Sequence, residues 1–158
     1  MRDFLNEVFD GYMQFIEIYN QHKPPIKPYA TYQVIFTDPM GIDTINREKS
    51  TTNENIVIET VIKQFKDTAQ IDIYSDSIND CKEKAKEIIL KLQYRYREIL
   101  IDRGFSLENI TQIKEIHSVG VSNVESRVSF NIIFSYSDSY SHEVENVNVV
   151  QFTAKESD

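Results

Sequence analysis

The run VESRVSFNIIFSY, from Val124 to Tyr136, constrains the fold more than any other part of the chain. Every second residue from Val124 onward is apolar, with Ser126 as the exception, and the residues between them are mainly polar. A period of two is the period of a β-strand, and a single apolar face indicates a strand with one side on a core and one side in water. Such half-buried strands are typical of antiparallel sheets.

Further segments have the composition of strands, namely 29–37, 56–65, 69–74, 113–121 and 144–152. Residues 66–68 predict either a hairpin or a bend within one long ribbon, and the serine-rich run 137–142 predicts a turn. Asp38-Pro39-Met40-Gly41 has the residues of a type I turn. The sequence that follows is polar and has no periodicity, which predicts a loop over residues 38–55.

The longest helical pattern covers residues 77–103. Ser77 is placed to cap its start, and Gly104 stands where a helix can end in left-handed backbone. One face is apolar and contains Ile78, Cys81, Ala85, Ile88, Leu92, Tyr96 and Ile99. A stripe with this spacing predicts an amphipathic helix that packs on the sheet.

A second helix is predicted over residues 1–22, because apolar residues recur there at steps of three and four. Pro24 and Pro25 end it, since each proline removes a backbone donor and restricts the residue before it. The tail 153–158 is expected to be frayed.

These elements predict an α+β fold: a mainly antiparallel β-sheet of about five to six strands, with an N-terminal helix and one long central helix packed on it. The chain has 158 residues, no internal repeat and no shift in composition. We therefore expect a single domain over residues 1–158.

Composition argues against most kinds of chemistry. The 17 basic and 25 acidic residues give a net charge of −8, which disfavours nonspecific binding to DNA or to an anionic membrane. The glycines form no phosphate-binding motif and the histidines lack metal-ligand spacing. The single cysteine, Cys81, lies on the apolar face of the long helix, where a buried, inert thiol is expected. We expect no enzymatic activity, no cofactor and no metal.

Two charged residues on strands have alternative interpretations. Asp72 lies between Ile71 and Ile73 and is expected to face solvent or a partner. Arg127 lies on the polar face of the alternating strand. It predicts either a cross-strand ion pair with an acid such as Glu145 or a contact between subunits.

Several features in this order resemble the tail-terminator, or tail-completion, neck proteins of long-tailed bacteriophages. They are an amphipathic N-terminal helix, a proline-bearing junction into PYATYQV, a polar loop, a strand pair that ends in AQIDIYSDS and leads into the helix INDCKEKAKEIILKL, and the late strand ESRVSFNIIFSYSDSY. The resemblance covers about residues 4–152.

The resemblance implies a structural virion protein at the head–tail junction. Such proteins form a ring, commonly a hexamer, that terminates the tail tube and joins it to the head-completion proteins. The implied partners are further copies of the chain, the tail-tube protein and other neck proteins, and a monomer in isolation is compatible with this role. DNA would pass through the ring without sequence-specific binding, since an acidic lumen repels phosphate. No membrane is involved, because no stretch is apolar enough to span one and no signal peptide is visible. The protein would be made in the host cytoplasm.

Residues expected at a subunit or partner interface are Tyr29, Tyr32, Met40, Ile42, Ile45, Arg47 and Arg127. Tyr29 and Tyr32 point to opposite faces of one strand, so one can serve the core and the other a neighbour. Two alternatives stay open. One is a head-completion or stopper protein of the neck, and the other is a cytoplasmic adaptor or immunity-type protein that binds a basic partner.

Overall fold

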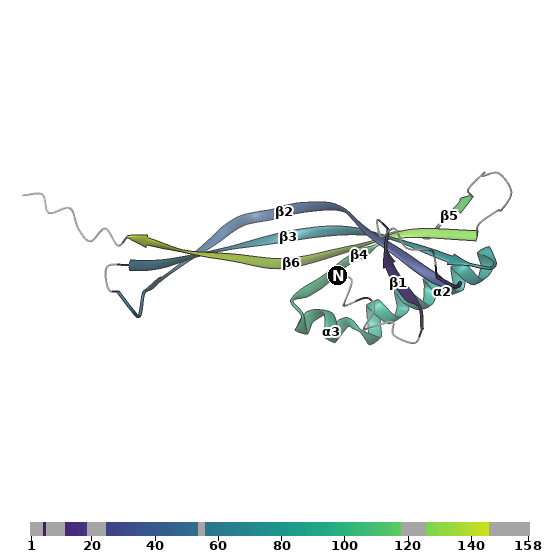
Figure 1. Cartoon of the computed structure of the whole chain (residues 1–158), viewed down its shortest axis with the longest axis horizontal. Coiled ribbons are helices and arrows are strands. Elements are labelled where there is room, and N and C mark those ends of the chain that lie inside the picture. Colours follow the sequence, from purple (N-terminus) through teal and green to yellow (C-terminus); the bar gives the residue numbers. More distant parts are fainter. Residues whose placement is uncertain (1–4, 6–11, 19–24, 54–55, 118–125, 146–158) are drawn as a thin grey trace, which may run out of the picture. The chain divides into compact units, whose positions relative to one another are not determined.

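The computed structural model describes residues 5, 12–18, 25–53, 56–117 and 126–145, to which the structural statements below refer. The elements are the strands β1 Gln14–Glu17, β2 Tyr29–Lys49 and β3 Ile56–Ser75, the helical segments α2 Ile78–Leu90, η1 Lys91–Arg95 and α3 Arg97–Asp102, and the strands β4 Phe105–Ile110, β5 Lys114–His117 and β6 Ser126–Glu145 (Figure 1).

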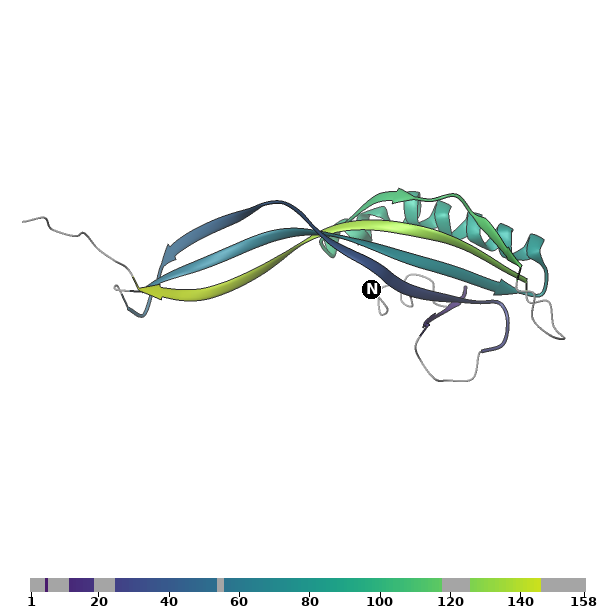
Figure 2. The same cartoon turned by 90° about the horizontal axis from the view of Figure 1, so that it is seen from above.

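The described strands form one six-stranded sheet in the order β1-β2-β3-β6-β4, with β5 also pairing with β6. Strands β4 and β5 run antiparallel to β6, whereas β1 runs parallel to β2. Within unit 1, Phe65 stacks on Tyr136 and Arg127 donates to the Tyr74 hydroxyl, so β3 and β6 also run antiparallel, and both strands can be followed in Figure 2. The predicted α+β class, with a mainly antiparallel sheet, is therefore confirmed.

The chain forms two compact units. Unit 1 contains residues 1–39 and 65–136, and unit 2 contains residues 40–64 and 137–158. Strands β2, β3 and β6 each contribute residues to both units. The division into units and the strands that they share do not test the single domain expected from the sequence. That expectation stays a prediction.

The long helical region of unit 1 begins and ends where the sequence predicts. Ser77 has extended backbone, with φ −138° and ψ 153°, and its hydroxyl accepts a hydrogen bond from the Asp80 amide at 3.2 Å. The hydroxyl thus satisfies one of the free donors of the first turn. Beyond α3, Gly104 has φ 79°, a left-handed conformation that glycine adopts without a steric cost.

The core of unit 1 lies between this helical region and the sheet. The buried residues are Leu5, Met13 and Phe15 from the N-terminal part, Ala30 and Tyr32 from β2, Ile71 and Ile73 from β3, Cys81, Ala85, Ile88, Leu92 and Leu100 from the helical region, and Val128, Phe130, Ile132 and Phe134 from β6. The alternating apolar residues of β6 thus face the helix, as predicted.

The π-helical segment η1 shifts the buried face of the helix by one residue. Leu100 is 2% exposed, whereas Ile99, which the spacing placed in the core, is 38% exposed. A π-turn contains more residues than an α-turn, so the residues beyond it are rotated about the helix axis. The expected inward position of Ile99 is therefore wrong.

The helix predicted over residues 1–22 is wrong for the part that is described there. Gln14–Glu17 form β1, which pairs with Tyr29–Tyr32, and of residues 1–11 only Leu5 is described, in helical conformation. The open side of β2 offers backbone partners to β1 while Phe15 remains buried, so a strand satisfies the backbone and the apolar side chain together. The rest of residues 1–11 and residues 19–22 lie outside the described residues.

The loop predicted over residues 38–55 and its type I turn are wrong as far as Lys49, because β2 continues through Pro39 and Gly41. Proline is tolerated on an edge strand, where no donor is needed, and Gly41 has φ 66°. The turn predicted at residues 137–142 is also wrong, because β6 continues to Glu145. The tail 153–158 lies outside the described residues.

Candidate interaction surfaces

A buried ion pair lies on the face of the unit 1 sheet that points away from the helix. Asp72 is 1% exposed, and its two oxygens accept hydrogen bonds from Gln70 Nε2 at 3.1 and 3.2 Å. The Arg127 guanidinium lies 3.8 Å from Asp72 Oδ2 and donates to the Tyr74 hydroxyl at 3.1 Å. A buried carboxylate is tolerated when it is paired and hydrogen-bonded. The expectation that Asp72 faces solvent or a partner is therefore wrong.

Arg127 makes the cross-strand ion pair that the sequence predicted, but with a different acid. Its partner is Asp72 on the adjacent strand β3, whereas Glu145 is the last residue of β6 and belongs to unit 2. Residues that share a strand cannot face each other across a ladder. The contact of Arg127 with another subunit stays a prediction.

Tyr29 and Tyr32 point to opposite faces, and both faces are covered within unit 1. Tyr32 is 4% exposed and belongs to the core beneath the helix. Tyr29 is 5% exposed, and its ring stacks on Tyr74 with centroids 4.7 Å apart. With this little exposed area, Tyr29 does not have the surface that the predicted contact with a neighbour requires.

The other predicted interface residues lie in unit 2, where charged side chains pair across strands. Arg47 Nε lies 2.8 Å from Glu59 Oε2, and Lys63 Nζ lies 2.8 Å from Asp43 Oδ1. The Thr60 and Ser141 hydroxyls are 2.9 Å apart. Arg47 is thus part of a ladder between β2 and β3.

Large apolar side chains lie exposed beside these pairs in unit 2. Ile42 is 97% exposed, Ile45 is 53% exposed and Tyr140 on β6 is 69% exposed, while Met40 is half-buried. The structure therefore places Met40, Ile42, Ile45 and Arg47 on one segment of β2. The exposed Tyr140, which the sequence did not single out, lies on β6, and β3 separates β6 from β2. Exposed apolar groups of this kind mark surfaces that contact other proteins.

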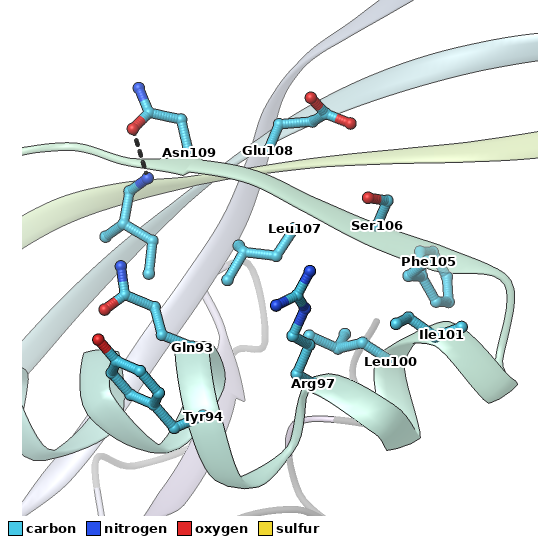
Figure 3. A pocket seen from close by; sticks show the side chains of 11 residues that line it. Gln93, Tyr94, Arg97, Leu100, Ile101, Phe105, Ser106, Leu107, Glu108 and Asn109 are labelled. Carbon is cyan, nitrogen blue, oxygen red and sulfur yellow. Dashed lines mark hydrogen bonds between the residues drawn. The ribbon is translucent and has the colours of Figure 1, made fainter.

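A groove of about 360 Å³ in unit 1 was not predicted. The end of the helical region forms one wall with Gln93, Tyr94, Arg97 and Ile101, and β4 forms the other (Figure 3). Tyr94 is 77% exposed and Ile101 is 58% exposed. Arg97 extends from the helix toward β4 (Figure 3). Tyr94 and Ile101 interrupt the polar side of the predicted helix, which is the one signal in the sequence for this groove.

The segment that precedes β1 is attached to the helix through Tyr12. The Tyr12 hydroxyl donates to Glu87 Oε2 at 2.5 Å, and Lys91 Nζ lies 3.5 Å from the centre of the Tyr12 ring. Burial and the Glu87 carboxylate raise the pKa of Tyr12 well above its ordinary value. The hydrogen bonds from Lys91 and Tyr12 hold the pKa of Glu87 below its usual range. These contacts hold the edge of the sheet against α2.

No reactive centre is visible within the described part of the chain. Cys81 is fully buried, as predicted, and its Sγ lies 3.3 Å from the Ser126 carbonyl oxygen. Burial raises the pKa of this thiol, which disfavours the nucleophilic thiolate. Among the described residues, no group of His, Cys, Asp or Glu side chains could hold a metal ion. None of the described helices is long and apolar enough to cross a membrane.

Comparison with protein families gives a match over the full chain. The model of a family described as "Phage neck terminator protein" matches residues 1–158. No curated protein matches the chain.

Proposed function

The chain belongs to the phage neck terminator protein family, and we propose that its copies form a ring, commonly a hexamer in such proteins, that closes the end of the tail tube. As a member of this family it is a structural protein of the virion at the head–tail junction, and not an enzyme. Membership implies interactions with the tail tube and with other neck proteins. The ring and the surfaces that build it are our proposal.

The observation that carries the proposal is the exposure of two large apolar side chains, Ile42 and Ile45, on the β2 segment of unit 2. An isoleucine that is 97% exposed on a regular strand contributes little to the stability of the free chain, but it contributes to binding when a partner covers it. We propose that Met40, Ile42, Ile45 and Arg47 contact another protein of the assembled neck. The ion pairs around them fix the strand register and keep the surface hydrated before assembly.

The acidic balance supports the passage of DNA. With a net charge of −8 on each chain, a ring of several copies repels phosphate, so the genome slides through without sequence-specific contacts.

The test is a phage that lacks this protein and is complemented with variants. Without the protein we expect unjoined tails of abnormal length in electron micrographs, and wild-type protein should restore joined particles. Ile42→Asp should restore few particles although the purified variant unfolds at the wild-type temperature, because Ile42 makes no core contacts. Ser139→Asp, which adds the same charge to an exposed position of β6 outside this segment, is the matched control. Normal-length tails with leaking heads would assign the protein a stopper role instead, and monomers on capped tails would refute the ring.

A further inference from the structure

The sheet of unit 1 is open at both edges: each edge strand has a side on which no described strand pairs with it. At one edge, β4 pairs with β6 and with no other described strand, and the amide of its last residue, Ile110, donates to Asn109 Oδ1 at 2.9 Å. At the other edge, β1 pairs with β2 only as far as Tyr32, and no described strand pairs with that side of β2 from Val34 onward. Open edges present unpaired backbone groups to which another strand can add.

The two edges carry complementary side chains. Arg97 lies in the groove beside β4 and makes no ion pair with any described residue. At the β2 edge, Asp38 likewise makes no hydrogen bond or ion pair within the described ranges, and Phe36 is 63% exposed. Opposite unpaired charges at two edges, each beside exposed apolar groups, favour the pairing of one edge with the other and disfavour the pairing of like edges.

The strand directions also fit. In unit 1, Phe65 stacks on Tyr136 and Tyr74 bonds Arg127, so β3 and β6 are antiparallel. Strand β4 is antiparallel to β6, and β2 is antiparallel to β3 through the reversal at Ser50, whose amide donates to the Ile56 carbonyl at 2.9 Å. Strands β2 and β4 therefore run in opposite directions. A second copy that continues the sheet brings its β2 antiparallel to β4, which is the more stable kind of pairing.

We propose that the groove beside β4 receives the β2 edge, residues 34–38, of a second copy of this chain. The contact joins two different edges, so every copy keeps one free edge of each kind and the series ends only when it closes as a ring. The inference rests on the proposed ring and names the surface through which neighbouring subunits meet.

The test uses the full chain with charge reversals at the two edges. Arg97→Glu and Asp38→Lys should each weaken self-association at least about tenfold, because each places like charges together. Arg95→Glu makes the same charge change on the same helical region outside the groove and should leave association unchanged. Association is measured by sedimentation velocity, for the free protein and for the protein bound to purified tail tubes.

Mixing the variants separates this contact from others. Arg97→Glu has an acidic groove and an acidic β2 edge, whereas Asp38→Lys has a basic groove and a basic β2 edge, so each groove of one variant meets an opposite charge on the edge of the other. A mixture should therefore assemble with alternating copies, although neither variant assembles alone. The double variant should regain the wild-type assembly. If Arg97→Glu associates like Arg95→Glu, or if the mixture stays monomeric, the surface is wrong while the ring stands. If the wild-type chain stays monomeric on tail tubes, the ring and this inference both fall.

Discussion

Replacing Arg127 should destabilise the protein more than replacing its partner Asp72. Asp72 is 1% exposed, so Arg127→Met leaves a buried carboxylate with only the Gln70 amide as donor. The Arg127 side chain is 31% exposed, so in Asp72→Asn the guanidinium keeps access to water and its bond to Tyr74. The two partners therefore differ in burial, and this difference is why the loss of Arg127 should cost more stability than the loss of the Asp72 charge.

The magnitude follows from the separation of the charges. At 3.8 Å two unit charges attract by about 4 kcal/mol at an effective dielectric constant of about 20. Because solvent screens the partly exposed guanidinium, we expect Arg127→Met to cost about 2–3 kcal/mol, which is at or below the low end of the about 3–5 kcal/mol that broken buried pairs cost. Asp72→Asn keeps the shape and one acceptor and should cost about 1 kcal/mol. At about 2–4 °C per kcal/mol for a chain of this length, Arg127→Met should lower Tm by about 4–12 °C.

Urea unfolding followed by circular dichroism measures both costs, provided that the m value stays the same across variants. An Asp72→Asn variant that loses as much stability as Arg127→Met would refute the asymmetry. An Arg127→Met variant within about 0.5 kcal/mol of wild type, the range of ordinary surface substitutions, would show that the ion pair contributes no net stability.

Two further predictions concern the packing of the helix. Ile88→Ala should cost about 2–5 kcal/mol because Ile88 is fully buried, whereas Leu90→Ala, at a side chain that is 56% exposed on the same helix, should cost under about 1 kcal/mol in urea unfolding; similar losses would contradict the packing of α2. The pKa of Tyr12 is raised in the folded state. Its contribution to the free energy of unfolding is therefore present below about pH 10 and is lost as pH rises further. The pKa of Glu87 is lowered, so its contribution is lost as pH falls through the acidic range. Tyr12→Phe should therefore lack the alkaline loss of stability, and parallel wild-type and variant profiles above about pH 10 would argue against the Tyr12–Glu87 bond.

Local patterns predict the elements whose neighbours agree with them. The face of β6 that packs on the helix, the cap at Ser77 and the stop at Gly104 all follow from residues close in sequence. Residues 38–41 and 137–142 have the composition of turns, yet they continue β2 and β6. There the pairing of long strands, for example Thr60 with Ser141, overrides local preference, and no local pattern contains that information.

The interaction surfaces were less predictable than the fold. The sequence placed Tyr29 at an interface because it alternates with a core tyrosine, but its burial depends on Tyr74 from another strand. Strand β4 escaped prediction because its register shifts between Leu107 and Asn109, which breaks the period of two. Without β4 the groove has only one wall, so no pattern in the sequence singles out Arg97.

The groove depends on an insertion and not only on residue type. One residue of an α-helix corresponds to about 100° of rotation, so the wide turn at Lys91–Arg95 sets which side of the following segment meets β4. Rewinding the same sequence as a regular α-turn would turn Ile99 inward and carry Arg97 away from the strand, whereas deleting one residue from the wide turn would keep Leu100 inward and Arg97 beside β4. The helix therefore gains or loses this surface through the winding of one turn, while the core beneath α2 stays the same.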